Sequence, residues 1–99
     1  MAVSYRISNR ARENLVEIYD YTAGQFGVYQ AEAYYAGLIR TFELLADFPN
    51  IGQRVDELAE GYRRFRFQAH FVFYTIAPDR VEIRAVIHHG REVRQELFR

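Results

Sequence analysis

Three histidines are the side chains of this sequence best suited to proton transfer near neutral pH. They are His70, His88 and His89, and imidazole titrates closest to neutrality. His88 and His89 end the last predicted strand, where either could act as a general acid or base; His70 is assigned to the turn before the central strand. Adjacent strand residues point to opposite faces, so we expect no metal ion to be shared by His88 and His89. A solvated pair at a strand end is the alternative interpretation.

Arginine is the second residue type with distinctive chemistry. All thirteen basic residues are arginine, whose planar guanidinium suits multidentate contacts with carboxylate or phosphate. A biased genomic composition would also produce this excess. We expect a cationic patch on one side of the sheet and its tail, made of Arg63, Arg64, Arg66, Arg84, Arg91 and Arg94. Such a patch suits nucleic acid, an acidic protein partner, or ordinary solvation of a sheet face.

Other kinds of chemistry lack the residues that they require. The chain has no cysteine, which excludes disulfides, thiolate nucleophiles and most structural zinc sites. Its six glycines are scattered, so no phosphate-cradling loop is present, and no hydroxyl lies in a nucleophile elbow. A formal net charge of zero argues against a dedicated, sequence-specific nucleic-acid binder. The residues alone therefore indicate no enzyme, metal site or cofactor.

The elements that must position these side chains begin with a strand and two helices. The chain of 99 residues predicts a single domain, 1–99, with a modest core. Alternating apolar residues predict a strand over residues 2–7. Ser8 is the expected N-cap of a helix whose apolar stripe ends at Gly27. The same period predicts a second helix over about residues 28–47, folded back on the first as a hairpin.

Residues 61–89 then predict an antiparallel meander of three strands, rich in β-branched and aromatic residues. The central strand is apolar on both faces, whereas the last strand is expected to alternate. Its predicted core face carries Val81, Ile83, Ala85 and Ile87. Val93 and Leu97 lie four apart in the tail, which predicts a short helix or a frayed end. We therefore expect an α+β domain with both helices on one face of the sheet.

The sequence also predicts a cytoplasmic location. No apolar run approaches the roughly 20 residues that a membrane-spanning helix needs. The residues at the N-terminus, MAVSYRIS, lack the apolar core of a signal peptide. We expect no association with a membrane.

Local sequence, taken in this order of elements, resembles the ParE toxins of the RelE/ParE superfamily. The opening strand and helix read YRISNRARENLVEIYDYTAGQFG, and the link after the second helix reads LLADFPNIGQRVDEL. The meander reads GYRRFRFQAHFVFYTI, and the closing strand and basic tail read RVEIRAVIHHGRE. The resemblance covers essentially the whole chain. It implies the toxin half of a bacterial type II toxin–antitoxin pair with the RelE/ParE fold.

The resemblance implies that the chain inhibits DNA gyrase by trapping its cleaved DNA complex, without being an enzyme. Contact with the target is then assigned to Arg63, Arg64, Arg66, Arg91 and Arg94. The sibling branch, which resembles RelE, cleaves messenger RNA on the ribosome. In that alternative His88 or His89 transfers protons, and Arg64 and Arg66 bind phosphate. The chain lacks a matching general-base glutamate and the usual tail tyrosine, which favours gyrase. An inert member kept for binding its partner is a third possibility.

The resemblance also implies a ParD-like antitoxin that dimerises through a ribbon-helix-helix end and forms a hetero-oligomer with the toxin. We expect its amphipathic segment to cover the helical hairpin, with acidic side chains that meet arginines. The helices carry more tyrosines than a small core needs, and partly exposed tyrosines are common in interfaces. Packing of these rings in the core is the alternative. The expected antitoxin site comprises Leu15, Ile18, Tyr19, Tyr21, Tyr29, Tyr35 and Arg84.

Overall fold

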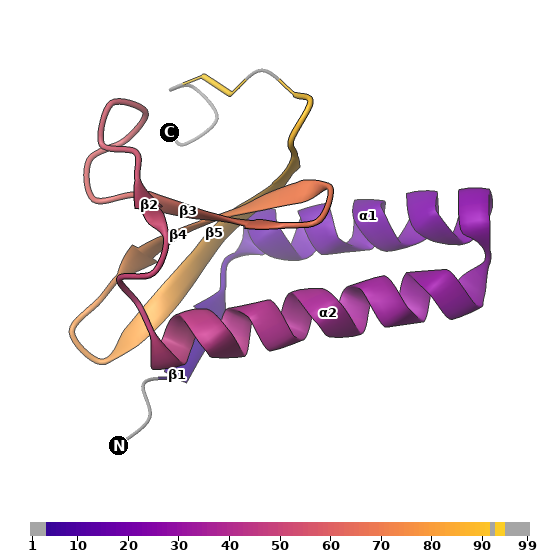
Figure 1. Ribbon diagram of the computed structural model, residues 1–99, viewed down its shortest axis with the longest axis horizontal. Coiled ribbons are helices and arrows are strands. Elements are labelled where there is room, and N and C mark those ends of the chain that lie inside the picture. The colour runs from indigo at the N-terminus through magenta and orange to yellow at the C-terminus, as the bar shows by residue number, and fades with distance from the viewer. Residues whose placement is uncertain (1–3, 92, 95–99) are drawn as a thin grey trace.

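The computed structural model describes residues 4–91, 93 and 94 of the chain. One strand, two long helices and a run of further strands follow in order (Figure 1). The elements are β1 (Ser4–Ile7), α1 (Asn9–Phe26), α2 (Val28–Asp47), β2 (Gln53–Arg54), β3 (Arg63–Phe67), β4 (His70–Ile76) and β5 (Arg80–His88). The expected α+β class is confirmed. Leu97, on which the predicted tail helix depends, lies outside the described residues.

The strands form one mixed sheet in the order β1-β5-β4-β3-β2. The predicted meander, β3 to β5, is antiparallel throughout. β1 joins its β5 edge in parallel, with Tyr5 opposite Val81, because the helical hairpin carries the chain away before it returns through the meander. β2 pairs with β3 at the other edge. The sequence does not predict β2, since two residues carry no periodicity.

The helical hairpin matches its prediction closely. Ser8 caps α1, and its Oγ accepts a hydrogen bond from the backbone N–H of Ala11 at 3.1 Å. Gly27 separates the helices with a φ of 94°, which residues with a side chain rarely adopt. Both helices pack on one face of the sheet. The buried cluster between the helices and the sheet comprises Ala11, Leu15, Leu38, Phe42, Leu45, Val72, Tyr74, Val81, Ile83 and Val86.

A smaller cluster lies on the opposite face of the sheet. It contains Val55, Phe73, Ala85 and Ile87, with Leu58, Tyr62, Phe71 and Val93 packed against it. The loop between β2 and β3 covers this face (Figure 1). Asp56 holds the loop, since its Oδ1 accepts a hydrogen bond from the N–H of Gly61 at 2.9 Å and its Oδ2 pairs with Arg54 at 2.9 Å. The sheet is thus covered on both faces, in part by irregular chain.

A β-bulge corrects the predicted core face of β5. Phe73 pairs with Ala85, whereas Tyr74 pairs with Ile83, so Arg84 is an extra residue in β5. Such a residue inverts the alternation of the side chains that follow it. Val81 and Ile83 therefore face the helices, whereas Ala85 and Ile87 belong to the opposite cluster. The expectation that all four share one face was wrong.

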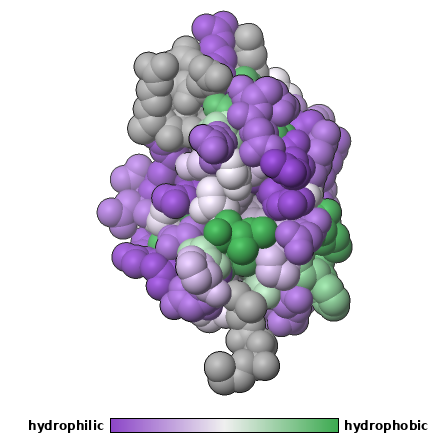
Figure 2. Space-filling view, turned by 90° about the vertical axis from the view of Figure 1, so that its left-hand side faces the viewer, coloured by the Kyte–Doolittle hydropathy of each residue, from purple (hydrophilic) through white to green (hydrophobic). Residues whose placement is uncertain are grey.

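Figure 2 shows one side of the molecule, and most of the surface on this side is hydrophilic, with apolar side chains only in small patches. Among the described residues, neither helix is long and apolar enough to span a membrane.

Candidate functional site

The three histidines meet where β5 ends beside the β3–β4 turn. The rings of His70 and His88 are 5.4 Å apart, edge to face. The rings of His88 and His89 stack at 4.7 Å. The expectation that His88 and His89 point to opposite faces was wrong, because β5 ends at His88 and His89 lies in the turn that follows. That turn is fixed by a hydrogen bond from the N–H of His89 to the carbonyl of Ala69 at 2.8 Å.

Helix α2 contributes a tyrosine that sequence patterns do not associate with these histidines. The hydroxyl of Tyr34 lies 2.7 Å from Nδ1 of His70 and accepts a hydrogen bond from the N–H of Ala69 at 3.2 Å. Burial, followed by the charges of His88 and His89, lowers the pKa of His70 to about 4. Burial, Arg66 and then His88 lower the pKa of His89 as well. At neutral pH His70 is therefore neutral, and its Nδ1 can accept a hydrogen bond from the hydroxyl of Tyr34.

Within residues 4–91, 93 and 94, no group of three or more histidines, aspartates and glutamates is placed to hold a metal ion. The histidine site consists of three imidazoles, one phenol and the nearby guanidinium group of Arg66. Its available chemistry is the exchange of protons and the binding of anions.

Arg64 and Arg66 lie on the sheet face opposite the helices, where both approach the ring of Phe71. The guanidinium carbon of Arg64 is 4.4 Å from the centre of the Phe71 ring, and that of Arg66 is 5.9 Å from it. Nε of Arg64 donates to Gln53 at 3.2 Å. Two cations over a half-buried ring form a compact positive surface suited to carboxylate or phosphate.

Arg63 lies apart from this surface. β-Strand alternation directs it to the face of Tyr74, with which it pairs. Its Nη1 donates to the carbonyl of Gly52 at 2.8 Å and to that of Asn50 at 3.3 Å. The buried hydroxyl of Tyr74 donates to the carbonyl of Pro49 at 2.7 Å, in the same link. Arg63 thus holds the chain between α2 and β2.

The remaining arginines of the expected patch are spread more widely. Arg84 occupies the bulge, and its Nε donates to Oγ1 of Thr75 at 3.0 Å. Arg91 and Arg94 are exposed beyond β5, and Val93 between them packs on the cluster that contains Phe71. Val93 therefore lies on the sheet face that carries Arg64 and Arg66.

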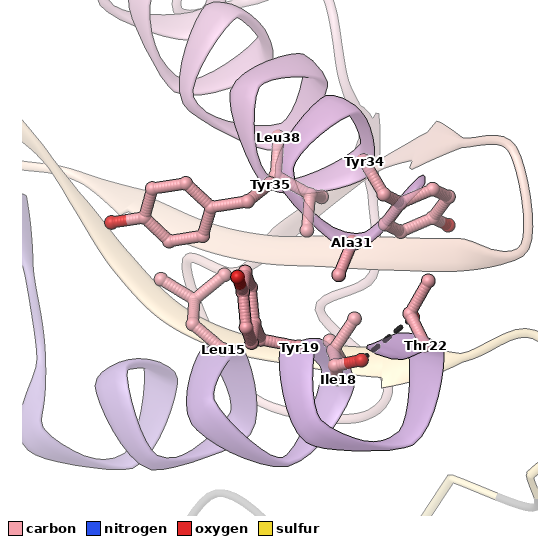
Figure 3. A pocket seen from close by; sticks show the side chains of 8 residues that line it. All are labelled: Leu15, Ile18, Tyr19, Thr22, Ala31, Tyr34, Tyr35 and Leu38. Atoms are coloured by element: carbon pink, nitrogen blue, oxygen red, sulfur yellow. Dashed lines mark hydrogen bonds between the residues drawn. The ribbon is translucent and has the colours of Figure 1, made fainter. Parts of the chain in front are cut away.

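A groove beside the helical hairpin is the second candidate site. Its volume is ≈ 320 Å³, and it is lined by Ile7, Arg12, Leu15, Val16, Tyr19, Asp20 and Tyr35. Tyr34 and Tyr35 leave α2 in opposite directions (Figure 3), so that one reaches the histidines and the other the groove. The hydroxyl of Tyr19 donates to Glu32 at 2.9 Å, which fixes the ring across the two helices.

The groove brings together three of the residues expected to bind an antitoxin: Leu15, Tyr19 and Tyr35. Ile18 packs between the helices (Figure 3). Tyr21 and Tyr29 lie outside the groove lining, toward the Gly27 end of the hairpin, with exposed fractions of 67% and 88%. Arg84, bonded to Thr75, is not part of the groove.

Known proteins match this chain over almost its whole length. Residues 5–93 match the family model described as "ParE toxin of type II toxin-antitoxin system, parDE". The chain belongs to the ParE toxin family. It is 40% identical over 93 residues to "Toxin ParE1" of Caulobacter vibrioides, which covers 94% of this chain and 96% of that protein. It is 33% identical over 98 residues to "Toxin ParE1" of Mycobacterium tuberculosis, at 98% and 100% coverage.

The fold of this ParE-family chain is also found in a solved structure. The structure is titled "Chromosomal ParDE TA system from P. aeruginosa" and superposes with a TM-score of 0.77. The match covers 88% of this chain and 96% of that chain, at 16% sequence identity. At this identity the likeness supports the shared fold.

Several residues of both sites were not predicted from the sequence. The groove residues absent from the expected set are Ile7, Arg12, Val16 and Asp20. A signal for the last three was available, because Arg12, Leu15, Val16, Tyr19 and Asp20 follow the i, i+3, i+4, i+7, i+8 spacing of one helix face. Tyr34 and Phe71 carried no comparable signal, since their partners lie on other elements.

Proposed function

We propose that this chain is a toxin that inhibits DNA gyrase and that a ParD-like antitoxin holds it inactive. The observation that carries the proposal is the ParE family match over residues 5–93. Gyrase acts in the cytoplasm, so the proposal places the chain there. It requires no cofactor and no catalytic step by the toxin, because a bound protein that stabilises the cleaved complex is sufficient for inhibition.

The target surface in this proposal is the sheet face around Phe71. Arg64 and Arg66 present their guanidinium groups there, and Arg91 and Arg94 extend the positive charge along the tail. Phosphate and carboxylate groups are abundant on a gyrase–DNA complex, and arginine binds both with paired hydrogen bonds. Arg63 has a structural role, because its guanidinium group is bonded to the carbonyls of Asn50 and Gly52.

The antitoxin surface in this proposal is the groove between α1, α2 and the end of β1. Exposed apolar side chains line it, among them Val16 and Tyr35, and an amphipathic segment would cover them on binding. The solved neighbour is titled as a ParDE system, which supports a ParD-type partner. A ribbon-helix-helix antitoxin would dimerise and give a hetero-oligomer.

The test is a plasmid supercoiling and cleavage assay with purified gyrase. We expect the toxin to block supercoiling and to cause cleaved plasmid to accumulate, and we expect added antitoxin to reverse both effects. The variant Arg64→Gln with Arg66→Gln should weaken inhibition at least about tenfold, since it removes two charge-assisted contacts. Arg40→Gln is the matched control, because Arg40 is an exposed arginine of α2 distant in the chain from β3. Unaffected gyrase would refute the proposal.

One observation favours a second function, ribosome-dependent cleavage of messenger RNA. His89 is exposed and its pKa is lowered, in part by Arg66, so a neutral imidazole lies near a cation that could bind phosphate. The double variant His88→Ala with His89→Ala separates the two functions. Gyrase inhibition should survive this change, whereas toxicity through RNA cleavage should be lost. A chain that can be expressed without antitoxin and without harm would instead be an inert member of the family.

A further inference from the structure

The groove beside the hairpin has opposite charges at its two ends. Arg12 lies one turn into α1, and Asp20 lies eight residues later on the same helix face. Leu15, Val16 and Tyr19 lie between them and form the apolar floor. The eight intervening steps correspond to about 12 Å along the helix axis. The groove therefore has a positive end, an apolar centre and a negative end.

Neither charge is neutralised by an ion pair within the described part of the chain. The ion pairs there join Arg54 to Asp56 and Arg80 to Asp79 and Glu82. Arg12 and Asp20 are both exposed, and no hydrogen bond of their side chains occurs among the described contacts. Solvation is the ordinary state of such charges. Their position at the two ends of an apolar groove gives them a second possible role in an interface.

We propose that Arg12 and Asp20 fix the direction in which the antitoxin segment lies in the groove. The inference rests on the proposed antitoxin binding and adds the chemistry of the occupant. The occupant is an amphipathic helix with an acidic side chain over Arg12, apolar side chains over Leu15 and Val16, and a basic side chain over Asp20. Reversing the segment would place like charges together at both ends, which electrostatic complementarity opposes.

The distance between the charges also defines the occupant's sequence. A helix rises 1.5 Å per residue, so an acid and a base about 12 Å apart on one face lie seven or eight residues apart. An extended segment rises about 3.3 Å per residue and would place them three or four residues apart. A helix laid along α1 could bury the apolar floor of the groove by ridge-into-groove packing. We infer a helical occupant, and the spacing of seven or eight residues is the one to test.

Charge reversal in the toxin tests this inference. Arg12→Glu and Asp20→Arg are each assayed for affinity to the full-length, purified antitoxin that neutralises the toxin. Both positions are exposed on α1, where substitutions change stability little, so folding should be retained. Arg10→Glu and Glu17→Arg are matched controls, because both positions are exposed on α1 outside the groove lining.

Each groove reversal should weaken binding at least about fivefold at low salt, and the controls should stay within about twofold. The loss should shrink in high salt, where charges are screened. In the antitoxin, changing the acidic residue that faces Arg12 to arginine should restore affinity for Arg12→Glu. The antitoxin residue that pairs with Asp20 should be basic and should lie seven or eight positions from that acid. Equal effects of groove and control variants would overturn the inference, as would a partner spacing of three or four. Failure of the wild-type toxin to bind antitoxin would instead refute the proposed function.

Discussion

The hydroxyl of Tyr34 and Nδ1 of His70 lie 2.7 Å apart and join helix α2 to the first residue of β4. The same hydroxyl accepts a hydrogen bond from the N–H of Ala69. Burial is the main cause of the raised pKa of Tyr34, so the phenol stays protonated and can donate. One side chain thus fastens the β3–β4 turn to the helical hairpin, beside the histidine site.

Removal of this hydroxyl should destabilise the fold. Tyr34→Phe leaves the N–H of Ala69 and Nδ1 of His70 without their partner, and we expect the free energy of unfolding to fall by about 1–3 kcal/mol. Urea denaturation followed by circular dichroism measures it. Tyr29→Phe is the control, because Tyr29 is 88% exposed and should change stability by less than about 0.5 kcal/mol. An equal effect of the two variants would contradict the role assigned to Tyr34.

Acid should destabilise the protein through His70. Its pKa is about 4 in the folded chain against about 6.5 in an unfolded chain, so the unfolded state binds more protons between these values. The stabilisation that comes from burying neutral His70 is fully present above about pH 6.5, and it is lost as the pH falls toward 4. A proton NMR titration of the His70 ring should give the low midpoint. The stability of His70→Gln should depend less on pH across this window, and an ordinary midpoint near 6.5 would refute the burial of the ring.

The elements of this fold were largely predictable from local patterns. The cap at Ser8, the break at Gly27 and the apolar periodicity of the two helices all lie within short stretches of sequence, so the hairpin was read correctly. The meander was recognised for the same reason. The bulge at Arg84 was not predictable, because the apolar and polar residues of β5 alternate in the sequence as they would in a regular strand. The extra residue nevertheless moves the side chains after it to the opposite face of the sheet.

The sites were less predictable than the elements. The groove follows one helix face, from Arg12 to Asp20, so its pattern is present in the local sequence. The contact between Tyr34 and His70 joins positions 36 residues apart, and no local spacing encodes it. Arg63, Arg64 and Arg66 are neighbours of the same type in the chain. Strand alternation places Arg63 on the face of Phe65 and Phe67, and the contacts of Arg63 with the carbonyls of Asn50 and Gly52 appear only in the structure.

Replacement by alanine should have opposite effects on stability at Gly37 of α2 and at Gly24 of α1. A Cβ at Gly37 would collide with the Phe67 ring, whereas one at Gly24 would have no neighbour within 4 Å. We expect Gly37→Ala to lower the free energy of unfolding by about 1–3 kcal/mol through overpacking. Gly24→Ala should raise it by about 0.5–1 kcal/mol, because alanine favours the helix. Thermal unfolding of the two variants distinguishes these signs, and stabilisation by Gly37→Ala would show that the ring moves away at little cost.

Arg63 and Arg66 should separate stability from toxicity. Arg63→Met deprives the carbonyls of Gly52 and Asn50 of a charged donor, and the free energy of unfolding should fall by about 2 kcal/mol. Arg66 is exposed, and its Nε bonds only the carbonyl of Gln68 among the described contacts, so Arg66→Gln should cost less than about 1 kcal/mol. Under the proposed function, Arg66→Gln should nevertheless lose much of its effect on gyrase while it remains folded. Arg63→Met should keep that effect at temperatures where it is folded. The reverse pattern, with Arg63 needed for inhibition and Arg66 for folding, would show that the target surface lies on the helix side of the sheet.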